Sequence, residues 1–143
     1  SKIGYLPQHT PLDFQFPIEV DDFVGLGLWG KEYRSKTTEV DRALEMTQSL
    51  DFRHRPLSEL SRGQLQRVSL ARTLVHSPNM LFLDEPLTGL DESTSDFLMD
   101  FLVKYRQGGG TVLMVLHDEY RRKKYEIDRI DLLGTQQPAE FSR

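Results

Sequence analysis

The feature that most constrains this chain is an apolar run that ends in two adjacent carboxylates, Leu81-Phe82-Leu83-Asp84-Glu85-Pro86. A continuous apolar run of this length is typical of a buried strand in a parallel sheet. Ligands of open parallel sheets bind beyond the C-terminal ends of the strands, which is where Asp84 and Glu85 stand. Taken alone, the run is more commonly an acidic turn after a core strand.

The two acids have chemically distinct uses if the run is a site. Neighbouring side chains of an extended strand point in opposite directions, so Asp84 and Glu85 can act separately. One carboxylate can hold Mg²⁺, usually through water. The other can polarise an attacking water as a general base.

A second candidate site lies upstream, where Leu60–Arg72 begins a predicted helix. Ser61 and Gly63 stand at the helix start, where unpaired N–H groups and the helix dipole attract an anion. A hydroxyl beside a glycine that permits close backbone approach suits a phosphate. A serine that only caps the helix is the commoner alternative.

Apolar periodicity predicts a helical first half, followed by alternating strands and helices. Strands are expected at Ile3–Leu6, Met80–Leu83, Thr111–Leu116 and Arg129–Leu133, the middle two buried. Helices are expected at Val20–Leu28, Thr38–Leu50, Arg62–Val75, from a Ser93–Asp96 capping box to Tyr105, and at Glu119–Tyr125. The alternation implies a parallel sheet with right-handed crossovers.

Composition narrows the classes of function. The 143 residues fit one domain, and the net charge of −4 argues against a broad, sequence-independent grip on nucleic acid. The absence of cysteine excludes disulfides and thiolate metal sites. The longest apolar runs are far too short to cross a bilayer, so work at a membrane would require binding to a partner there.

Five segments together resemble the ATP-binding cassette (ABC) ATPases, in that family's order from Ile3 to Asp118. Tyr5–Gln8 resembles the glutamine loop, Leu60–Gln64 the signature motif, Leu81–Pro86 the Walker B strand and its glutamate, Leu87–Asp91 the D-loop, and Leu116–Asp118 the switch histidine. The resemblance implies an α/β fold: a truncated P-loop NTPase with an α-helical signature subdomain and a mostly parallel sheet flanked by helices. Residues 1–8 would be the glutamine-loop strand, 9–78 the helical subdomain and 79–143 the C-terminal part of the RecA-like core.

The resemblance also implies a role for each motif residue. Glu85 would be the general base, Asp84 would support Mg²⁺, and Gln8 would contact Mg²⁺ or the attacking water. His117 would contact the γ-phosphate of ATP, and Asp91 would cross a dimer interface. The signature residues Ser61, Gly63 and Gln64 would act on ATP held by the opposite subunit. Arg62 departs from the family's usual glycine, and the sequence does not decide whether it adds charge or crowds the phosphate.

The family's Gly-rich phosphate loop has one look-alike here, Gly25–Lys31, which we reject. It is followed by Glu32 instead of a hydroxyl residue, it continues a helical pattern, and it lies after the glutamine loop. In the family the loop and an adenine-stacking aromatic precede the glutamine loop. The 143 residues alone are therefore expected to bind ATP poorly, to hydrolyse none, and to self-associate through backbone groups left unpaired by the missing strand.

The segment Pro11–Val24 resembles the corresponding segment of bacterial metal-ion and iron-chelate importers. This implies an ATP-hydrolysing subunit of a zinc, manganese or iron importer, at the cytoplasmic face of the membrane. Its partners would be a transmembrane permease subunit and a second ATPase subunit, with no nucleic acid. Two alternatives remain: a soluble ABC ATPase acting on DNA or ribosomes, and a non-catalytic truncated module that only docks to a partner.

Overall fold

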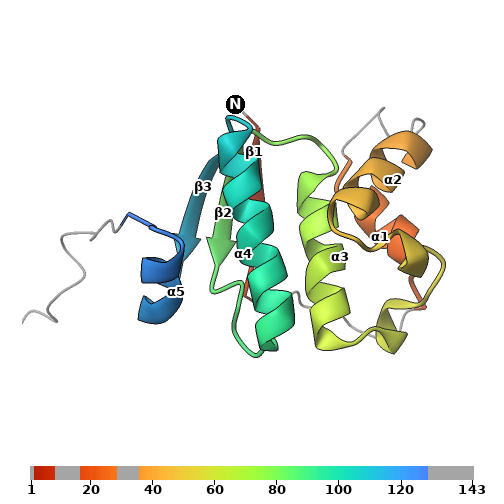
Figure 1. Ribbon diagram of the computed structural model, residues 1–143. Coiled ribbons are helices and arrows are strands. Elements are labelled where there is room, and N and C mark those ends of the chain that lie inside the picture. The colour runs from red at the N-terminus through yellow and green to blue at the C-terminus, as the bar shows by residue number, and fades with distance from the viewer. Residues whose placement is uncertain (1, 9–16, 29–35, 129–143) are drawn as a thin grey trace, which may run out of the picture.

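The computed structural model describes residues 2–8, 17–28 and 36–128, which form a helical unit beside a sheet. Figure 1 shows α1, α2 and α3 on one side and the strands with α4 and α5 on the other. In chain order the elements are β1 (Ile3–Leu6), α1 (Val20–Gly25), α2 (Lys36–Met46), the 3₁₀ turns η2 (Leu50–Phe52) and η3 (Leu57–Glu59), α3 (Arg62–Leu74), β2 (Met80–Asp84), α4 (Glu92–Gln107), β3 (Thr111–Val115) and α5 (Glu119–Lys124).

The sheet has three parallel strands in the order β1-β2-β3. Tyr5 pairs with Phe82, which in turn pairs with Leu113. Because all three strands run in the same direction, their C-terminal ends meet at one edge. The parallel sheet predicted from the sequence is confirmed, and the strand expected at Arg129–Leu133 lies outside the described residues.

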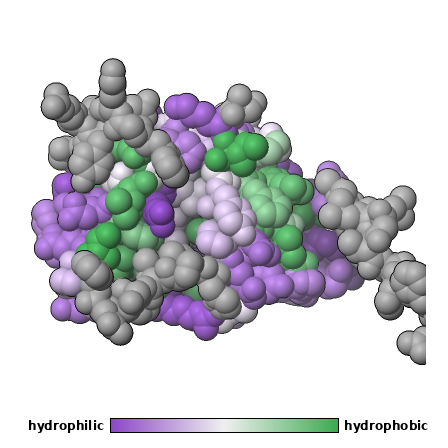
Figure 2. All heavy atoms as spheres, turned by 180° about the vertical axis from the view of Figure 1, so that it is seen from behind, coloured by the Kyte–Doolittle hydropathy of each residue, from purple (hydrophilic) through white to green (hydrophobic). Residues whose placement is uncertain are grey.

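The two faces of the sheet differ in burial. Leu6, Leu81 and Leu83 are 0–1% exposed on the face covered by α3 and α4. On the opposite face Tyr5 is 53% exposed and Leu113 43% exposed. Figure 2, which views the molecule from behind, shows apolar side chains on that side.

The prediction that Thr111–Leu116 is a buried strand is wrong in one respect. The strand forms at Thr111–Val115, but its residues alternate between exposed and half-buried. Helix α4 packs on one face of β3 only, so Val112 and Met114 touch the core while Leu113 and Val115 do not.

The helical unit has a closed core between α1, α2 and α3. Its buried members are Val20, Phe23, Val24, Leu28, Val40, Ala43, Leu44, Leu57, Val68, Ala71 and Val75. The guanidinium of Arg72 lies 4.8 Å from the centre of the Phe23 ring, which adds a cation–π contact at the edge of this core. The apolar positions spaced three and four apart therefore face inward, as the periodicity predicts.

Two helices end earlier than predicted, and each has a local cause. Helix α2 ends at Met46, not Leu50, because Gln48 adopts a φ of +53°. The amide of Ser49 then bonds to the carbonyl of Leu44 at 2.8 Å, the Schellman arrangement that closes a helix. Helix α1 ends at Gly25 and continues as turns through Leu28.

Helix α4 begins at Glu92, so the predicted Ser93–Asp96 capping box is wrong. The N-cap is Asp91, whose carboxylate accepts the amide N–H of Thr94 at 2.8 Å. An aspartate caps a helix about as well as a serine, and Asp91 precedes Ser93 in the chain, so the helix begins earlier than predicted. The helix ends at Gln107 with Gly108 as its C-cap, as the run of three glycines predicts.

The rejected look-alike at Gly25–Lys31 has the wrong local structure in the part that is described. Gly25 closes α1, and Leu26–Leu28 form turns after a helix, whereas a phosphate loop follows a strand. Its last residues lie outside the described ranges. Among the helices described, none combines the length and the apolar character needed to cross a bilayer.

Candidate nucleotide-hydrolysis site

The C-terminal edge of the sheet gathers polar residues from all three strands. Gln8 follows β1, Asp84 ends β2 with Glu85 directly after it, and His117 follows β3. Residues more than seventy positions apart in the sequence become neighbours here because parallel strands end at a common edge.

The carboxylate of Glu85 is the centre of this group. Its Oε2 accepts a hydrogen bond from the side-chain amide Nε2 of Gln8 at 2.8 Å, and its Oε1 lies 3.1 Å from Nε2 of His117. The hydroxyl of Thr88 donates to Oε2 at 3.2 Å. The three residues for which the sequence suggested catalytic roles, Gln8, Glu85 and His117, are thus in direct contact.

The backbone of Glu85 is strained. Its φ is +44°, a left-handed conformation that costs a non-glycine residue roughly 1 kcal/mol or more. The amide of Glu85 bonds to the carbonyl of Val115 at 3.2 Å, so β3 helps to hold it in place.

Asp84 lies apart from that group. Burial alternates along β2, and Asp84 is half-buried on the same face as Phe82, opposite Leu83. Its carboxylate forms no hydrogen bond or ion pair with Gln8, Glu85 or His117. The two acids therefore differ in surroundings, as their adjacency on a strand predicts.

The donors at this edge suit a hard cation. Asp84 offers carboxylate oxygens, and Gln8 uses its amide nitrogen for Glu85, which leaves its amide oxygen for another partner. Mg²⁺ prefers such oxygen ligands and keeps most of its waters, so one or two protein ligands suffice. These residues therefore fit Mg²⁺ by their chemistry.

The signature residues begin α3 and form a capping box. The Ser61 hydroxyl accepts the amide N–H of Gln64 at 3.2 Å, and the Gln64 side-chain oxygen accepts the Ser61 amide N–H at 3.0 Å. The serine is thus a helix cap, the alternative raised by the sequence. Because the hydroxyl acts as an acceptor in this bond, its own proton remains available to an anion.

Arg62 and Gly63 are fixed by contacts with the next segments of the chain. The Arg62 guanidinium occupies the space that a side chain at Gly89 would need, and Gly89 has a φ of +71°. A Cβ on Gly63 would lie 2.8 Å from Oγ1 of Thr94, so only glycine lets α3 and α4 approach this closely. Arg62 therefore extends to the loop at residues 87–91.

Asp91 caps α4, and its surroundings favour the charged form. Hydrogen bonds from Thr94, with a smaller contribution from the nearby Arg67, lower the pKa of Asp91 below its ordinary value. Asp118, which follows His117, caps α5 in the same way, and hydrogen bonds from Arg121 lower its pKa. The helices α4 and α5, which follow the loops at this edge of the sheet, therefore each begin with a carboxylate cap whose charged form is favoured.

Two surface depressions lie on either side of the loop at residues 87–91. The first, about 210 Å³, is lined by Glu85, Thr88, His117 and Arg121 among others. The second, about 410 Å³, is lined by the signature residues Ser61–Gln64 together with Gly89 and Asp91. Leu90 lines both, so Glu85 and the signature residues serve different depressions of the same chain.

Thr88 and Gln66 are site residues that the sequence analysis did not single out. Thr88 stands three residues after Glu85, a spacing that closes a turn and returns its hydroxyl to that carboxylate. The Gln66 side chain donates to the carbonyl of Pro86 at 2.9 Å and ties α3 to the loop after β2. The sequence could have indicated Thr88 through its turn spacing. It could not have indicated Gln66, because that contact joins residues twenty positions apart.

The curated relatives of this chain include ATP-binding proteins of metal transport systems. The manganese transport system ATP-binding protein MntB of Listeria monocytogenes is 39% identical over 94% of this chain and 58% of its own length. The zinc transport system ATP-binding protein TroB of Treponema pallidum is 36% identical over 97% of this chain and 54% of its own. The chain thus spans somewhat more than half the length of these curated relatives.

Solved structures agree on the fold. CbiO1 of Clostridium perfringens, part of the ABC transporter complex CbiONQ, matches 82% of this chain and 47% of its own, with a TM-score of 0.65 and 33% identity. An ATP-binding cassette of another ABC transporter matches 85% of this chain and 54% of its own, with a TM-score of 0.72 and 20% identity. The sequence profile described as "ABC transporter" matches residues 1–88. This chain belongs to the ABC transporter family and has the fold of its ATP-binding subunits.

Proposed function

We propose that this chain is part of an ATP-hydrolysing subunit that drives a metal-ion importer, with Glu85 as the general base. The observation that carries the proposal is the contact of the Glu85 carboxylate with both Gln8 and His117 at the ends of three parallel strands. Such a carboxylate can take a proton from water while the water oxygen attacks the γ-phosphorus of ATP. ADP leaves, and inorganic phosphate is released.

Each neighbour of Glu85 has a part in this reaction. Gln8 and Thr88 both donate to Oε2 of Glu85, which fixes the carboxylate and leaves Oε1 to face His117 and the water. The side chain of His117 is 78% exposed, and its Nε2 N–H would turn from Oε1 of Glu85 to a phosphate oxygen when ATP is bound. Asp84 and the Gln8 amide oxygen would hold Mg²⁺, which neutralises phosphate charge when bound.

The signature residues would serve a second nucleotide. Ser61, Gly63 and Gln64 line the depression that Glu85 does not line, so one chain presents two separate halves of a site. Two copies of the intact protein facing each other would complete both sites, with Ser61 and the amides at the α3 N-terminus toward ATP bound by the other copy. Arg62 and Asp91 would stand at that interface.

Manganese or zinc is the cargo that the relatives favour, since MntB and TroB are named for manganese and zinc transport. Transport requires a transmembrane permease, which we propose as the partner of the helical unit at the cytoplasmic side of the membrane. The 143 residues on their own contain no Gly-rich loop ending in Lys and Ser/Thr, and we expect them to hydrolyse no ATP.

The test uses the intact subunit with its permease. Glu85→Gln keeps the hydrogen-bonding shape but removes the base, and should lower the ATPase kcat at least about a hundredfold while ATP still binds. Glu92→Gln, at an exposed residue in the first turn of α4, is the matched control and should leave the rate unchanged. An undiminished ATPase rate in Glu85→Gln would contradict the proposal that Glu85 is the general base.

A further inference from the structure

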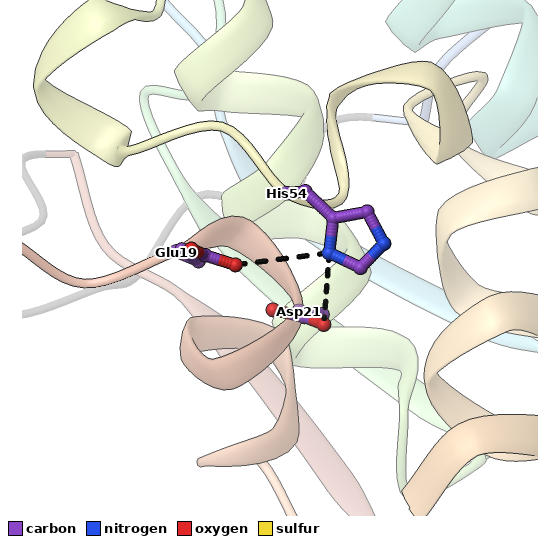
Figure 3. Close-up of side chains that lie close together, drawn as sticks. All are labelled: Glu19, Asp21 and His54. Carbon is purple, nitrogen blue, oxygen red and sulfur yellow. Dashed lines mark ion pairs between the residues drawn. The ribbon is translucent and has the colours of Figure 1, made fainter.

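A cluster of metal-binding side chains lies on the helical unit, outside the strand-end site. Glu19 and Asp21 stand at the start of α1, and His54 stands in the turn after η2. One ligand atom from each lies within 4.8 Å of the others, and among the described residues this is the one such group of three. Figure 3 shows one ring nitrogen of His54 facing both carboxylates.

The distances are too long for hydrogen bonds and suit a bridging cation. Nδ1 of His54 lies 3.7 Å from Oε2 of Glu19 and 3.7 Å from Oδ2 of Asp21. One imidazole N–H cannot serve two carboxylates at this separation. Tetrahedral ligand atoms about 2.1 Å from Zn²⁺ stand roughly 3.4 Å apart, so the two 3.7 Å separations would need to close by only a few tenths of an ångström around an ion.

The backbone holds the two segments together before any ion arrives. The amide of Val20 bonds to the carbonyl of Arg55 at 3.1 Å, and the amide of Asp21 bonds to the carbonyl of Arg53 at 3.0 Å. Glu19 also forms an antiparallel bridge with Pro56. The three ligands thus sit on a rigid frame, which reduces the entropy lost when an ion binds.

The neighbouring arginines are occupied elsewhere. Arg53 pairs most closely with Asp41, at 2.7 Å, and its other guanidinium nitrogen lies 4.0 Å from the Oδ2 of Asp21 that also faces His54. The Arg55 side chain donates to the carbonyl of Glu59 at 2.8 Å. Asp21 itself is oriented, because its Oδ1 accepts the amide N–H of Asp22 at 2.8 Å and its Oδ2 remains toward His54.

From these contacts we propose that Glu19, Asp21 and His54 form a binding site for a divalent transition-metal ion of the Zn²⁺ type. One imidazole nitrogen with two carboxylate oxygens, completed by water, is a donor set that Zn²⁺ accepts readily. Imidazole gives little advantage to Mg²⁺, and the order of divalent affinities places Zn²⁺ above Mn²⁺. The side chains of Glu19 and His54 are 50% and 72% exposed, so an ion can enter from solvent.

The experiment is calorimetric titration of the 143-residue chain with Zn²⁺, with Mg²⁺ as the comparison ion. We expect one Zn²⁺ site that His54→Ala weakens at least about tenfold, and that Glu19→Gln also weakens. Mg²⁺ at the same concentrations should not compete with Zn²⁺ for this site, and any Mg²⁺ bound at the strand-end residues should be unchanged by His54→Ala. Circular dichroism without metal should show all variants folded, since the substituted side chains are at the surface.

Two matched controls separate this site from general metal adsorption. Glu45→Gln removes the same charge from an exposed position on α2, and His117→Ala removes the other exposed histidine whose position is described. Both should bind Zn²⁺ as the parent chain does. Absence of Zn²⁺ binding, equal binding by His54→Ala, or loss of binding in His117→Ala would overturn the proposal.

Discussion

The helical unit and the sheet bury their apolar residues in opposite ways. In the helical unit α1, α2 and α3 pack around one core, and Phe23 is 1% exposed. Within the described part of the chain, helices cover one face of the sheet, and on the other face Tyr5 stacks on Phe82 at a 5.5 Å ring separation. The sheet thus holds the Glu85 carboxylate at its edge and leaves one apolar face uncovered among the described residues, whereas the apolar core of the helical unit is buried.

The largest contrast should appear in stability. Phe23→Ala opens a cavity in the closed core and removes the Arg72 contact, so it should lower the free energy of unfolding by about 3–5 kcal/mol. Leu113→Ala, at a position 43% exposed on the open face, should change it by about 0.5 kcal/mol or less. Urea denaturation followed by circular dichroism measures both. Equal losses would show that the open face is buried in solution.

The open face should also control self-association, which the sequence analysis predicts for this chain. A contiguous apolar surface with Tyr5 and Leu113 at its centre favours contact between copies. Leu113→Lys should weaken that association by about tenfold or more, since a buried leucine contributes roughly 1.5–3 kcal/mol. Light scattering over a concentration series tests this, with Thr111→Lys at the end of the same strand as a control of smaller effect. A parent chain that stays monomeric throughout contradicts the prediction.

A smaller difference should separate substitutions at Glu85 itself. Glycine tolerates the φ of +44° without strain, although it costs more entropy on folding. Glu85→Gly should therefore leave the free energy of unfolding close to that of the parent. Glu85→Val should lower it by about 1 kcal/mol or more, because a β-branched residue is poorly accommodated at positive φ. Thermal denaturation of the two variants gives the order, and a more stable valine variant would mean that the turn relaxes.

The smallest effect concerns the ionised cap of α4. The pKa of Asp91 is lower in the folded chain than its ordinary value, so its stabilising contribution is present above about pH 4 and is lost as the pH falls through the folded pKa. Asp91→Asn keeps a capping side chain but cannot ionise. Between pH 7 and pH 3 the asparagine variant should lose less stability than the parent chain. Identical losses would show that the cap is not formed in solution.

Local patterns were enough to predict most elements and the residues around Glu85. The strands at Ile3 and Met80 and the helix from Arg62 follow from apolar spacing and capping chemistry, which act over a few residues. The contact of Gln8, Glu85 and His117 was anticipated only because parallel strands share an edge and because the motifs resemble a known family. The role of each residue in hydrolysis remains a prediction.

What the sequence did not indicate depends on distant contacts or on single dihedral angles. The positive φ of Gln48, which ends α2, has no marker such as a glycine. Arg62 could not be placed without the Gly89 backbone, which is far along the chain but adjacent in space. The same holds for His54, which reaches Glu19 only because the backbones of two loops are paired.

The loop at residues 87–91 has a consequence of its own. It forms one wall of the depression beside Glu85 and one wall of the depression beside Ser61, with Leu90 reaching both. A movement of this loop into one depression would enlarge the other. Two contacts hold the loop against α3: the Arg62 guanidinium lies against Gly89, and the Gln66 side chain bonds to the carbonyl of Pro86. A ligand that displaced this loop from one depression would therefore change the shape of the other.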